Sequence, residues 1–214
     1  MTEPFATAVS FDLLKVGHCQ HPECMALRGG SRRAIDFPAL VGLIKHPQHG
    51  LMLYDTGYSE HFTRATRGFP ECLYRIVTPV TLPPEEELLA QLESRGIAAH
   101  EIDTIFISHF HADHIAGLRD FPQARFIATG AEYHHCQKLN RFHRLRRAYL
   151  RDLIPADFAE RLTIAESCPS MSLPEQLAPF TEARDLLGDA SMAGRLTTTR
   201  SPPPARLVSV RVPW

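Results

Sequence analysis

Three histidines and an aspartate fall within six consecutive positions of this chain, directly after an apolar segment. The segment, residues 102–108 (IDTIFIS), is apolar and rich in isoleucine, which predicts a buried strand. The clustered residues are His109, His111, Asp113 and His114. In extended backbone His109 and His111 point the same way, because side chains alternate with a period of two. Such a polar cluster at the end of a buried strand is costly unless a cation neutralises it, so the sequence predicts a metal site.

The residue types in this cluster indicate which metal it would take. Neutral imidazole and carboxylate ligands suit zinc, with manganese or iron as substitutes. The competing interpretation is a surface loop that is rich in histidine by chance, in a chain with 12 histidines. An isolated His-x-His pair would favour that interpretation, whereas the full His-x-His-x-Asp-His pattern after a strand favours the metal site.

The other apolar segments predict an α/β fold in which helices cover a mixed sheet. A short turn rich in Pro and Gly, residues 47–50, joins two apolar runs and predicts a hairpin. Strands are expected at residues 7–16, 37–45, 51–54, 102–108 and 124–129.

Two helices are also expected. The first begins near Pro84, places Leu88, Leu89 and Leu92 on one face, and ends at Gly96. The second is one long helical stretch over residues 130–153. Its expected inner positions are Leu139, Phe142, Leu145 and Leu150.

The composition restricts the class of protein. The chain has 23 Lys and Arg against 24 Asp and Glu, so its neutral total gives no overall attraction to nucleic acid or anionic lipid. The longest apolar runs are too short to cross a bilayer, and the first residues lack the basic region of a secretory signal. Five scattered cysteines favour reduced thiols. We therefore expect a cytoplasmic globular protein with no membrane partner.

The last part of the chain has a different composition. No acidic residue follows Asp189, and arginines are interspersed with Thr, Ser and Pro tracts. We expect one packed domain over residues 1–190 and an irregular Arg/Thr/Pro-rich tail over residues 191–214. Within that tail, residues 207–212 could form one short strand.

The His-x-His-x-Asp-His string resembles the signature of the metallo-β-lactamase superfamily, and two further segments strengthen the resemblance. Residues 102–109 are similar to the family's strand that leads into the metal loop, and Asp55-Thr56-Gly57 is similar to its Asp-Thr-Gly element. The resemblance covers about residues 5–190. The early hairpin and the single long helix after the metal loop look most like the N-acyl-homoserine lactonase group of hydrolases.

The resemblance implies a fold, a metal centre and a reaction. The fold would be the αβ/βα sandwich of mixed sheets. His109 and His111 would bind a first Zn(2+) ion, and Asp113 and His114 a second. Asp55 would orient these ligands from behind. Metal-activated water, oriented by Asp113 as the catalytic residue, would hydrolyse a small-molecule lactone, thioester or carboxylic ester.

Part of the family's ligand set has no counterpart here. The resemblance implies a third His in a downstream Gly-His element, then a bridging Asp and a last His, yet no His follows His143. Asp185 and Asp189 precede the expected element and are not assigned as ligands. Two histidines fall short of the three protein ligands typical of catalytic zinc. We therefore expect an incomplete second half of the sandwich, as in a truncated or frame-shifted version of a longer hydrolase.

Three other groups of residues admit a functional interpretation. Residues 18–24 (HCQHPEC) hold two Cys and two His, but their spacing is too compact for four ligands on one ion, which favours a loop. His134 and His135 favour a polar helix face, with replacement of the missing ligand as the alternative. The arginine-rich residues 141–151 would suit a nuclease, but nearby acids and the neutral total charge argue against a nucleic-acid partner.

Two alternatives to the hydrolase stay open. The first is a non-catalytic fragment or degenerate member of the superfamily, which lacks the third His and the bridging Asp. The second is a nuclease of the same superfamily. Metal content and the salt dependence of RNA binding would separate these alternatives from the hydrolase.

Overall fold

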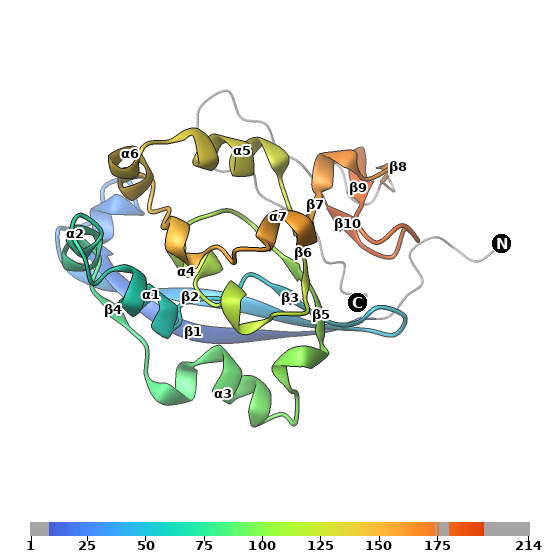
Figure 1. Cartoon of the computed structure of the whole chain (residues 1–214), viewed down its shortest axis with the longest axis horizontal. Coiled ribbons are helices and arrows are strands. Elements are labelled where there is room, and N and C mark those ends of the chain that lie inside the picture. The colour runs from blue at the N-terminus through green and yellow to red at the C-terminus, as the bar shows by residue number, and fades with distance from the viewer. Residues whose placement is uncertain (1–8, 174, 176–179, 195–214) are drawn as a thin grey trace.

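The chain forms a seven-stranded mixed sheet and a separate three-stranded antiparallel sheet, with the helices packed on one face of the larger sheet and the C-terminal segment packed on the other (Figure 1). The computed structural model describes residues 9–173, 175 and 180–194. The order of the large sheet is β4-β1-β2-β3-β5-β6-β7. Its strands are β1 (Ser10–Pro22), β2 (Ala34–His46), β3 (Gly50–Tyr54), β4 (Val80–Thr81), β5 (Ile102–Phe106), β6 (Arg125–Ala128) and β7 (Leu162–Ile164).

The large sheet has an antiparallel half and a parallel half. Strands β4, β1, β2 and β3 are antiparallel neighbours, and the β2–β3 pair, with Leu43 opposite Leu53, is the predicted hairpin. Strands β3, β5, β6 and β7 run parallel. Parallel neighbours need crossover connections, and the helical segments of this chain supply them.

The helices are short. They are α1 (Glu60–Ala65), α2 (Cys72–Val77), α3 (Leu88–Glu93), α4 (Ala112–Ile115), α5 (Gly130–Lys138), α6 (Arg141–Arg146) and α7 (Phe158–Arg161). Further 3-10 turns span Glu23–Met25, Pro84–Glu86, Ala99–Glu101, Leu118–Asp120, Arg151–Leu153 and Ala165–Ser167. Helix α3 lies apart from α4, α5, α6 and α7 in the view of Figure 1, but all five contribute side chains to one apolar cluster on the same face of the large sheet.

The core divides into two clusters because successive residues of a strand point to opposite faces. Leu43, Leu53 and Ile105 belong to the larger cluster. Their neighbours Ile44, Met52 and Phe106 belong to the smaller one, which Leu186 and Met192 of the C-terminal segment complete. The smaller sheet therefore has a packing role: its strands are β8 (Ser170–Ser172), β9 (Glu182–Asp185) and β10 (Ala193–Gly194).

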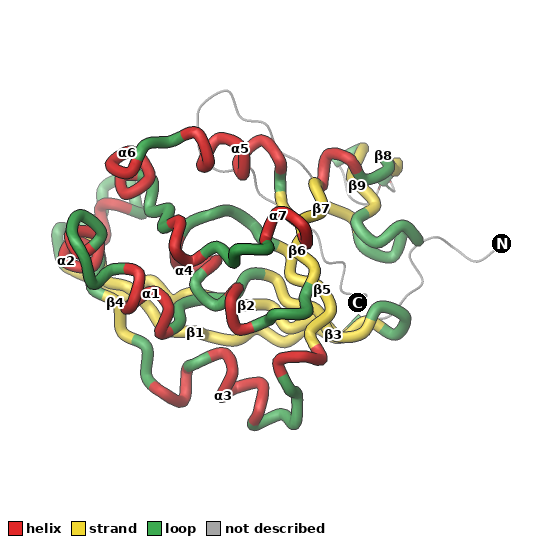
Figure 2. The backbone as a smooth tube through the Cα atoms, in the orientation of Figure 1, coloured by secondary structure: helices red, strands yellow, loops and turns green. Residues whose placement is uncertain are grey.

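All five predicted strands are present, but the predicted single helix over residues 130–153 is wrong. Figure 2 shows helical pieces and loops between β6 and β7. The break falls at Asn140, whose side chain accepts a hydrogen bond from His143 N and so begins a new helix, α6. Phe142, expected inside, is 60% exposed as a consequence, while Leu150 is buried as predicted.

The predicted helix over residues 84–96 is shorter than expected. A 3-10 turn precedes α3, and only Leu88 and Leu92 of the three leucines are buried, because Leu89 faces outward. Gly96 ends this segment with φ +71°, the left-handed conformation that favours glycine after a helix.

The described part of the predicted tail is short. Residues 191–194 include β10, which pairs with β9. The possible strand at residues 207–212 lies outside the described residues. Among the described residues, no helix is both long and apolar enough to span a bilayer.

Candidate functional site

The predicted metal loop lies where two parallel strands end side by side. Strand β3 runs into Asp55, and its neighbour β5 runs through Ile107 into Ser108. The Asp55 N–H donates to the Phe106 carbonyl at 2.8 Å, which extends the pairing to the strand ends. Because the carboxyl ends of parallel strands share one edge of the sheet, residues 53 positions apart in the sequence come into contact.

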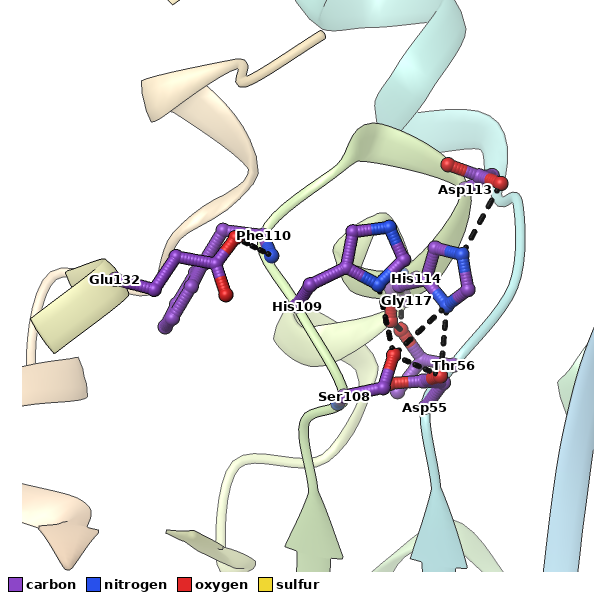
Figure 3. Close-up of polar contacts among 9 residues, drawn as sticks. All are labelled: Asp55, Thr56, Ser108, His109, Phe110, Asp113, His114, Gly117 and Glu132. Atoms are coloured by element: carbon purple, nitrogen blue, oxygen red, sulfur yellow. Dashed lines mark hydrogen bonds and ion pairs between the residues drawn. The ribbon is translucent and has the colours of Figure 1, made fainter. Parts of the chain in front are cut away.

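Asp55 is the centre of a buried hydrogen-bond network, drawn in Figure 3. It is 2% exposed and has φ +64°, a conformation that Asp tolerates better than most residues. Its Oδ1 accepts the Ser108 N–H at 2.8 Å. Its Oδ2 accepts from Ser108 Oγ at 2.6 Å and from His114 Nδ1 at 2.7 Å. Three donors therefore converge on one carboxylate.

This network determines which ring nitrogens carry protons. A carboxylate accepts only, so Ser108 must donate its hydroxyl proton to Asp55, and Nδ1 of His114 must also be protonated. The Ser108 oxygen is then the acceptor for His109 Nδ1, 3.0 Å away. On both histidines Nδ1 is held by a hydrogen bond, so Nε2 is the nitrogen placed to bind a cation.

The next residue of the Asp-Thr-Gly element, Thr56, also holds the metal loop in place. Thr56 is fully buried, and both its N–H and its Oγ1 donate to the His114 carbonyl, at 2.9 and 3.0 Å. Thr56 Oγ1 also accepts from the Gly117 N–H at 3.1 Å. These bonds fix the short helix α4, which carries Asp113 and His114, against the end of β3.

The four predicted ligands form one cluster. The ring of His109 lies 4.4 Å from that of His111 and 3.9 Å from that of His114, measured between centroids. Asp113 Oδ2 lies 3.2 Å from His114 Nε2. The side chains thus converge and do not point separately into water.

The types of side chain in this cluster suit a divalent cation, but their arrangement in this structure does not. Imidazole nitrogens held by a carboxylate behind them, together with one further carboxylate, are the ligands that zinc prefers. Among the described residues, however, no group of three or more His, Cys, Asp or Glu side chains is placed to hold an ion as it stands. Asp113 and His114 form an ion pair with each other, so this pair would have to separate for both side chains to bind a cation.

The protonation of the cluster follows from the same contacts. Burial acts to raise the pKa of Asp113, but its hydrogen bond and ion pair with His114 outweigh burial and leave the pKa below its usual value. Burial acts to lower the pKa of His114, but Asp113 and Asp55 raise it. Burial lowers the pKa of His111; the negative charge of Asp113 opposes this shift, and the positive charges of His114 and Arg147 add to it. Asp113 is therefore ionised and His111 neutral, as ligands must be, whereas His114 is protonated and would have to lose its Nε2 proton to bind a cation.

Glu132, which contacts the metal loop from α5, was not predicted from the sequence. Its Oε1 accepts the Phe110 N–H at 3.3 Å, between His109 and His111 in the sequence (Figure 3). Its Oε2 is buried without a hydrogen-bond partner, and burial raises the pKa of Glu132 to about 7. The signal that could have found it is position: it follows β6, the next parallel strand beyond β5.

We expect Glu132→Ala to loosen the metal loop. The substitution leaves the buried Phe110 N–H without its acceptor, which should lower the free energy of unfolding by ~1–2 kcal/mol. Glu132→Gln retains an oxygen acceptor and resembles the protonated acid, so we expect its stability within ~0.5 kcal/mol of the parent chain. Urea unfolding of the three proteins measures this; equal losses for Ala and Gln would refute the role of the hydrogen bond.

The other candidates from the sequence lie outside this cluster of ligands. Of the two thiols in residues 18–24, Cys19 is buried and Cys24 exposed, and all five cysteines of the chain are free. His134 and His135 are exposed on α5. Asp185 accepts from three backbone N–H groups of its own turn, and Asp189 pairs with His49 at 2.8 Å, so both have structural partners.

Comparison with known proteins places this geometry in a family. Residues 34–205 match the family model of the metallo-beta-lactamase superfamily. Two mycobacterial proteins, each a probable metallo-hydrolase, from Mycobacterium bovis and Mycobacterium tuberculosis, are each 31% identical over 97 residues. That match covers 42% of this chain and only 28% of the length of each relative.

Solved structures share the fold at low sequence identity. An N-acyl homoserine lactone hydrolase with N-hexanoyl-L-homoserine bound at its catalytic metal centre superposes with a TM-score of 0.60 and 18% identity, over 82% of this chain and 70% of that one. AiiA of B. thuringiensis, with N-decanoyl-L-homoserine at its active site, gives 0.59 and 18%, with the same coverages. A probable metal-dependent hydrolase from Staphylococcus aureus gives 0.53 and 20%, over 73% and 58%. The expected likeness to lactonases is confirmed at the level of the fold.

Proposed function

The chain belongs to the metallo-beta-lactamase superfamily, and from this membership we propose that it is a hydrolase that uses metal-activated water to cleave an ester-like bond. The proposed substrates are small molecules that contain a lactone, a thioester or a carboxylic ester. The proposed metal is zinc. Its ligands would be His109 and His111 for one ion, and Asp113 and His114 for a second.

The observation that carries this proposal is the hydrogen-bond network of Asp55. Burying the Asp55 carboxylate costs desolvation free energy, and its left-handed backbone adds a conformational cost. The carboxylate receives three hydrogen bonds, and the network they form does more than stabilise the edge of the sheet. It holds Nδ1 of both His109 and His114, so that each ring presents Nε2 to the same cluster. Such support behind the ligands is typical of metal sites.

The residues of the cluster have separate roles in the proposed reaction. A bound divalent cation would supply Lewis acidity, which polarises the substrate carbonyl and lowers the pKa of water to about 7. Asp113 is ionised, so its carboxylate would orient the attacking water and accept a proton from it. The water oxygen then bonds to the carbonyl carbon, the bond from that carbon to the leaving oxygen or sulfur breaks, and Asp113 returns the proton to the leaving group.

The proposed substrate class rests on two kinds of support. Lactones, thioesters and carboxylic esters share an electrophilic carbonyl beside a leaving group that needs one proton, which matches one carboxylate beside a cation. Two of the solved structures with this fold hold N-acyl-L-homoserines, one at its active site and the other, as a product, at its catalytic metal centre. At 18% identity these likenesses concern the fold, so the lactone is a proposal for this chain.

Zinc content and hydrolysis test the proposal together. We expect the purified chain, loaded with zinc and freed of excess metal, to retain zinc and to hydrolyse at least one of a γ-lactone, a thioester and an aryl ester. His111→Ala should lose at least one ion and lower kcat/KM by ~10²-fold or more. His100→Ala is the matched control, because His100 is exposed in the 3-10 turn before β5, at the end of that strand remote from the loop.

The outcomes separate the proposal from its main alternative. Unchanged zinc content in His111→Ala would remove the proposed site. Zinc that depends on His111 but supports no hydrolysis would favour the degenerate, non-catalytic member of the superfamily. That second candidate is kept because the described residues present no completed three-ligand group and no His follows His143 in the sequence.

A further inference from the structure

Positive charge is concentrated in one segment beside the metal loop. Residues 130–151 contain six Lys and Arg and three His but only one acid, Glu132, although the whole chain carries a formal charge of −1. This segment forms α5, α6 and the strap that follows them. Local charge of this kind attracts anions even where the total is neutral.

The arginines of this segment fall into two groups. Arg141 donates two hydrogen bonds of 2.7 Å to Glu71, and Arg144 donates to the carbonyls of Cys136 and Gln137. These two have structural partners. Arg146 and Arg147 are exposed, and neither forms an ion pair with any carboxylate in the described part of the chain.

Arg146 and Arg147 line a groove between α5 and α6. The groove has a volume of about 400 Å³ and is lined by His135, Leu139, His143, Arg146 and Arg147. Four of its five residues are basic, and none is acidic. Arginine presents a planar fork of donors that matches a carboxylate or a phosphate, so the lining suits an oxyanion.

The strap that follows Arg147 of the groove is attached to the metal loop. The Ala148 carbonyl, next to Arg147, accepts the Ala112 N–H at 2.9 Å, so the strap after α6 is attached to the loop between His111 and Asp113. Ala148 adopts φ +52°, an uncommon conformation for a residue with a Cβ. The charge of Arg147 acts on both His111 and Glu132, which places it within electrostatic reach of the cluster.

A guanidinium beside a cation-binding cluster is repelled by the cation that the cluster would hold. An anion between them removes the repulsion. We propose that the groove lined by His135, His143, Arg146 and Arg147 binds an oxyanion group, a carboxylate or a phosphate, of the substrate, so that the enzyme prefers anionic esters. The part of this inference that concerns the substrate rests on the proposed function; the part that concerns anion binding does not.

Anion binding can be measured without turnover. Calorimetric titration of the full chain with inorganic phosphate and with glutarate, in a chelator and again after zinc loading, should show saturable binding in both states. Replacing both arginines (R146Q/R147Q) should weaken this binding by ~10-fold or more, the equivalent of ~1.4 kcal/mol. The matched control is R95Q/R125Q, which removes the same charge from two exposed arginines, one after α3 and one at the start of β6.

The results of the titrations decide whether the groove is an anion-binding site. Binding that is equal in the parent chain and in R146Q/R147Q, or that is lost equally in R95Q/R125Q, overturns the groove. Stronger binding of one oxyanion identifies which of the two the groove accepts. Binding of a single-stranded oligonucleotide far tighter than phosphate, with a steep salt dependence, would assign the basic surface to nucleic acid and overturn the small-molecule site.

A second arm tests the substrate preference. The zinc-loaded chain is offered two aryl esters that differ only in a carboxylate at the end of the acyl chain. We expect a higher kcat/KM for the anionic ester, and R146Q/R147Q should lower kcat/KM for the anionic ester by a larger factor than for the neutral one, which removes this preference. An equal rate for both esters overturns the preference. No hydrolysis of either ester by any form refutes the proposed function, while the binding arm still decides the groove.

Discussion

If the proposed metal site is correct, replacing Asp55 with Asn should abolish most of its affinity for zinc while leaving the fold largely intact. The two side chains have nearly the same shape, and Asn tolerates the positive φ of this position, so the backbone need not move. The amide, however, offers its NH₂ group where Oδ2 accepts from Ser108 and His114. His114 Nδ1 would then accept a hydrogen bond, and its proton would move to Nε2, the atom proposed to bind the cation.

The expected loss is ~10–100-fold in zinc affinity, with a similar fall in kcat/KM. Competition with a chromogenic chelator measures the affinity, and NMR of the imidazole nitrogens reports the tautomer. Asp12→Asn is the matched control, since Asp12 is exposed on β1. If Asp55→Asn binds zinc as tightly as the parent chain and keeps the Nδ1–H tautomer of His114, the role assigned to Asp55 is wrong.

The second large effect is expected at Gly57, the last residue of the Asp-Thr-Gly element. It has φ +67°, and an added Cβ would overlap Val16, 2.6 Å from its Cγ1. Val16 is fully buried on β1, so it has little room to yield. Gly57→Ala therefore combines backbone strain with overpacking and should lower the free energy of unfolding by ~2–5 kcal/mol.

The variant Gly96→Ala separates the cost of backbone strain from the cost of overpacking. Gly96 has almost the same φ, +71°, but an added Cβ there meets nothing within 4 Å. It should therefore show the conformational cost alone, ~1 kcal/mol. Chemical unfolding of the two variants gives both values. A Gly57→Ala loss no larger than that of Gly96→Ala would show that the contact with Val16 has no energetic weight.

Several features of the fold were predicted correctly because their causes are local. The strand over residues 102–108 shows in a run of apolar residues, and the β2–β3 hairpin in two such runs joined by a Pro- and Gly-containing turn. Helix boundaries were less accurate. Leucines on both sides of Asn140 continued an apparent helical pattern. In the structure Asn140 caps a new helix, so the predicted single helix is divided at this residue.

The sequence by itself determined the superfamily and the identity of the candidate ligands, because these are properties of short segments: a strand followed by His109 to His114, and Asp55-Thr56-Gly57. The tertiary structure alone decided how those segments work together. The strand order brings Asp55 to Ser108, Glu132 to the Phe110 N–H, and the basic strap after α6 to Ala112. These contacts join residues that are 22 to 53 positions apart, and no local pattern encodes them, because they depend on which strands and helices become neighbours.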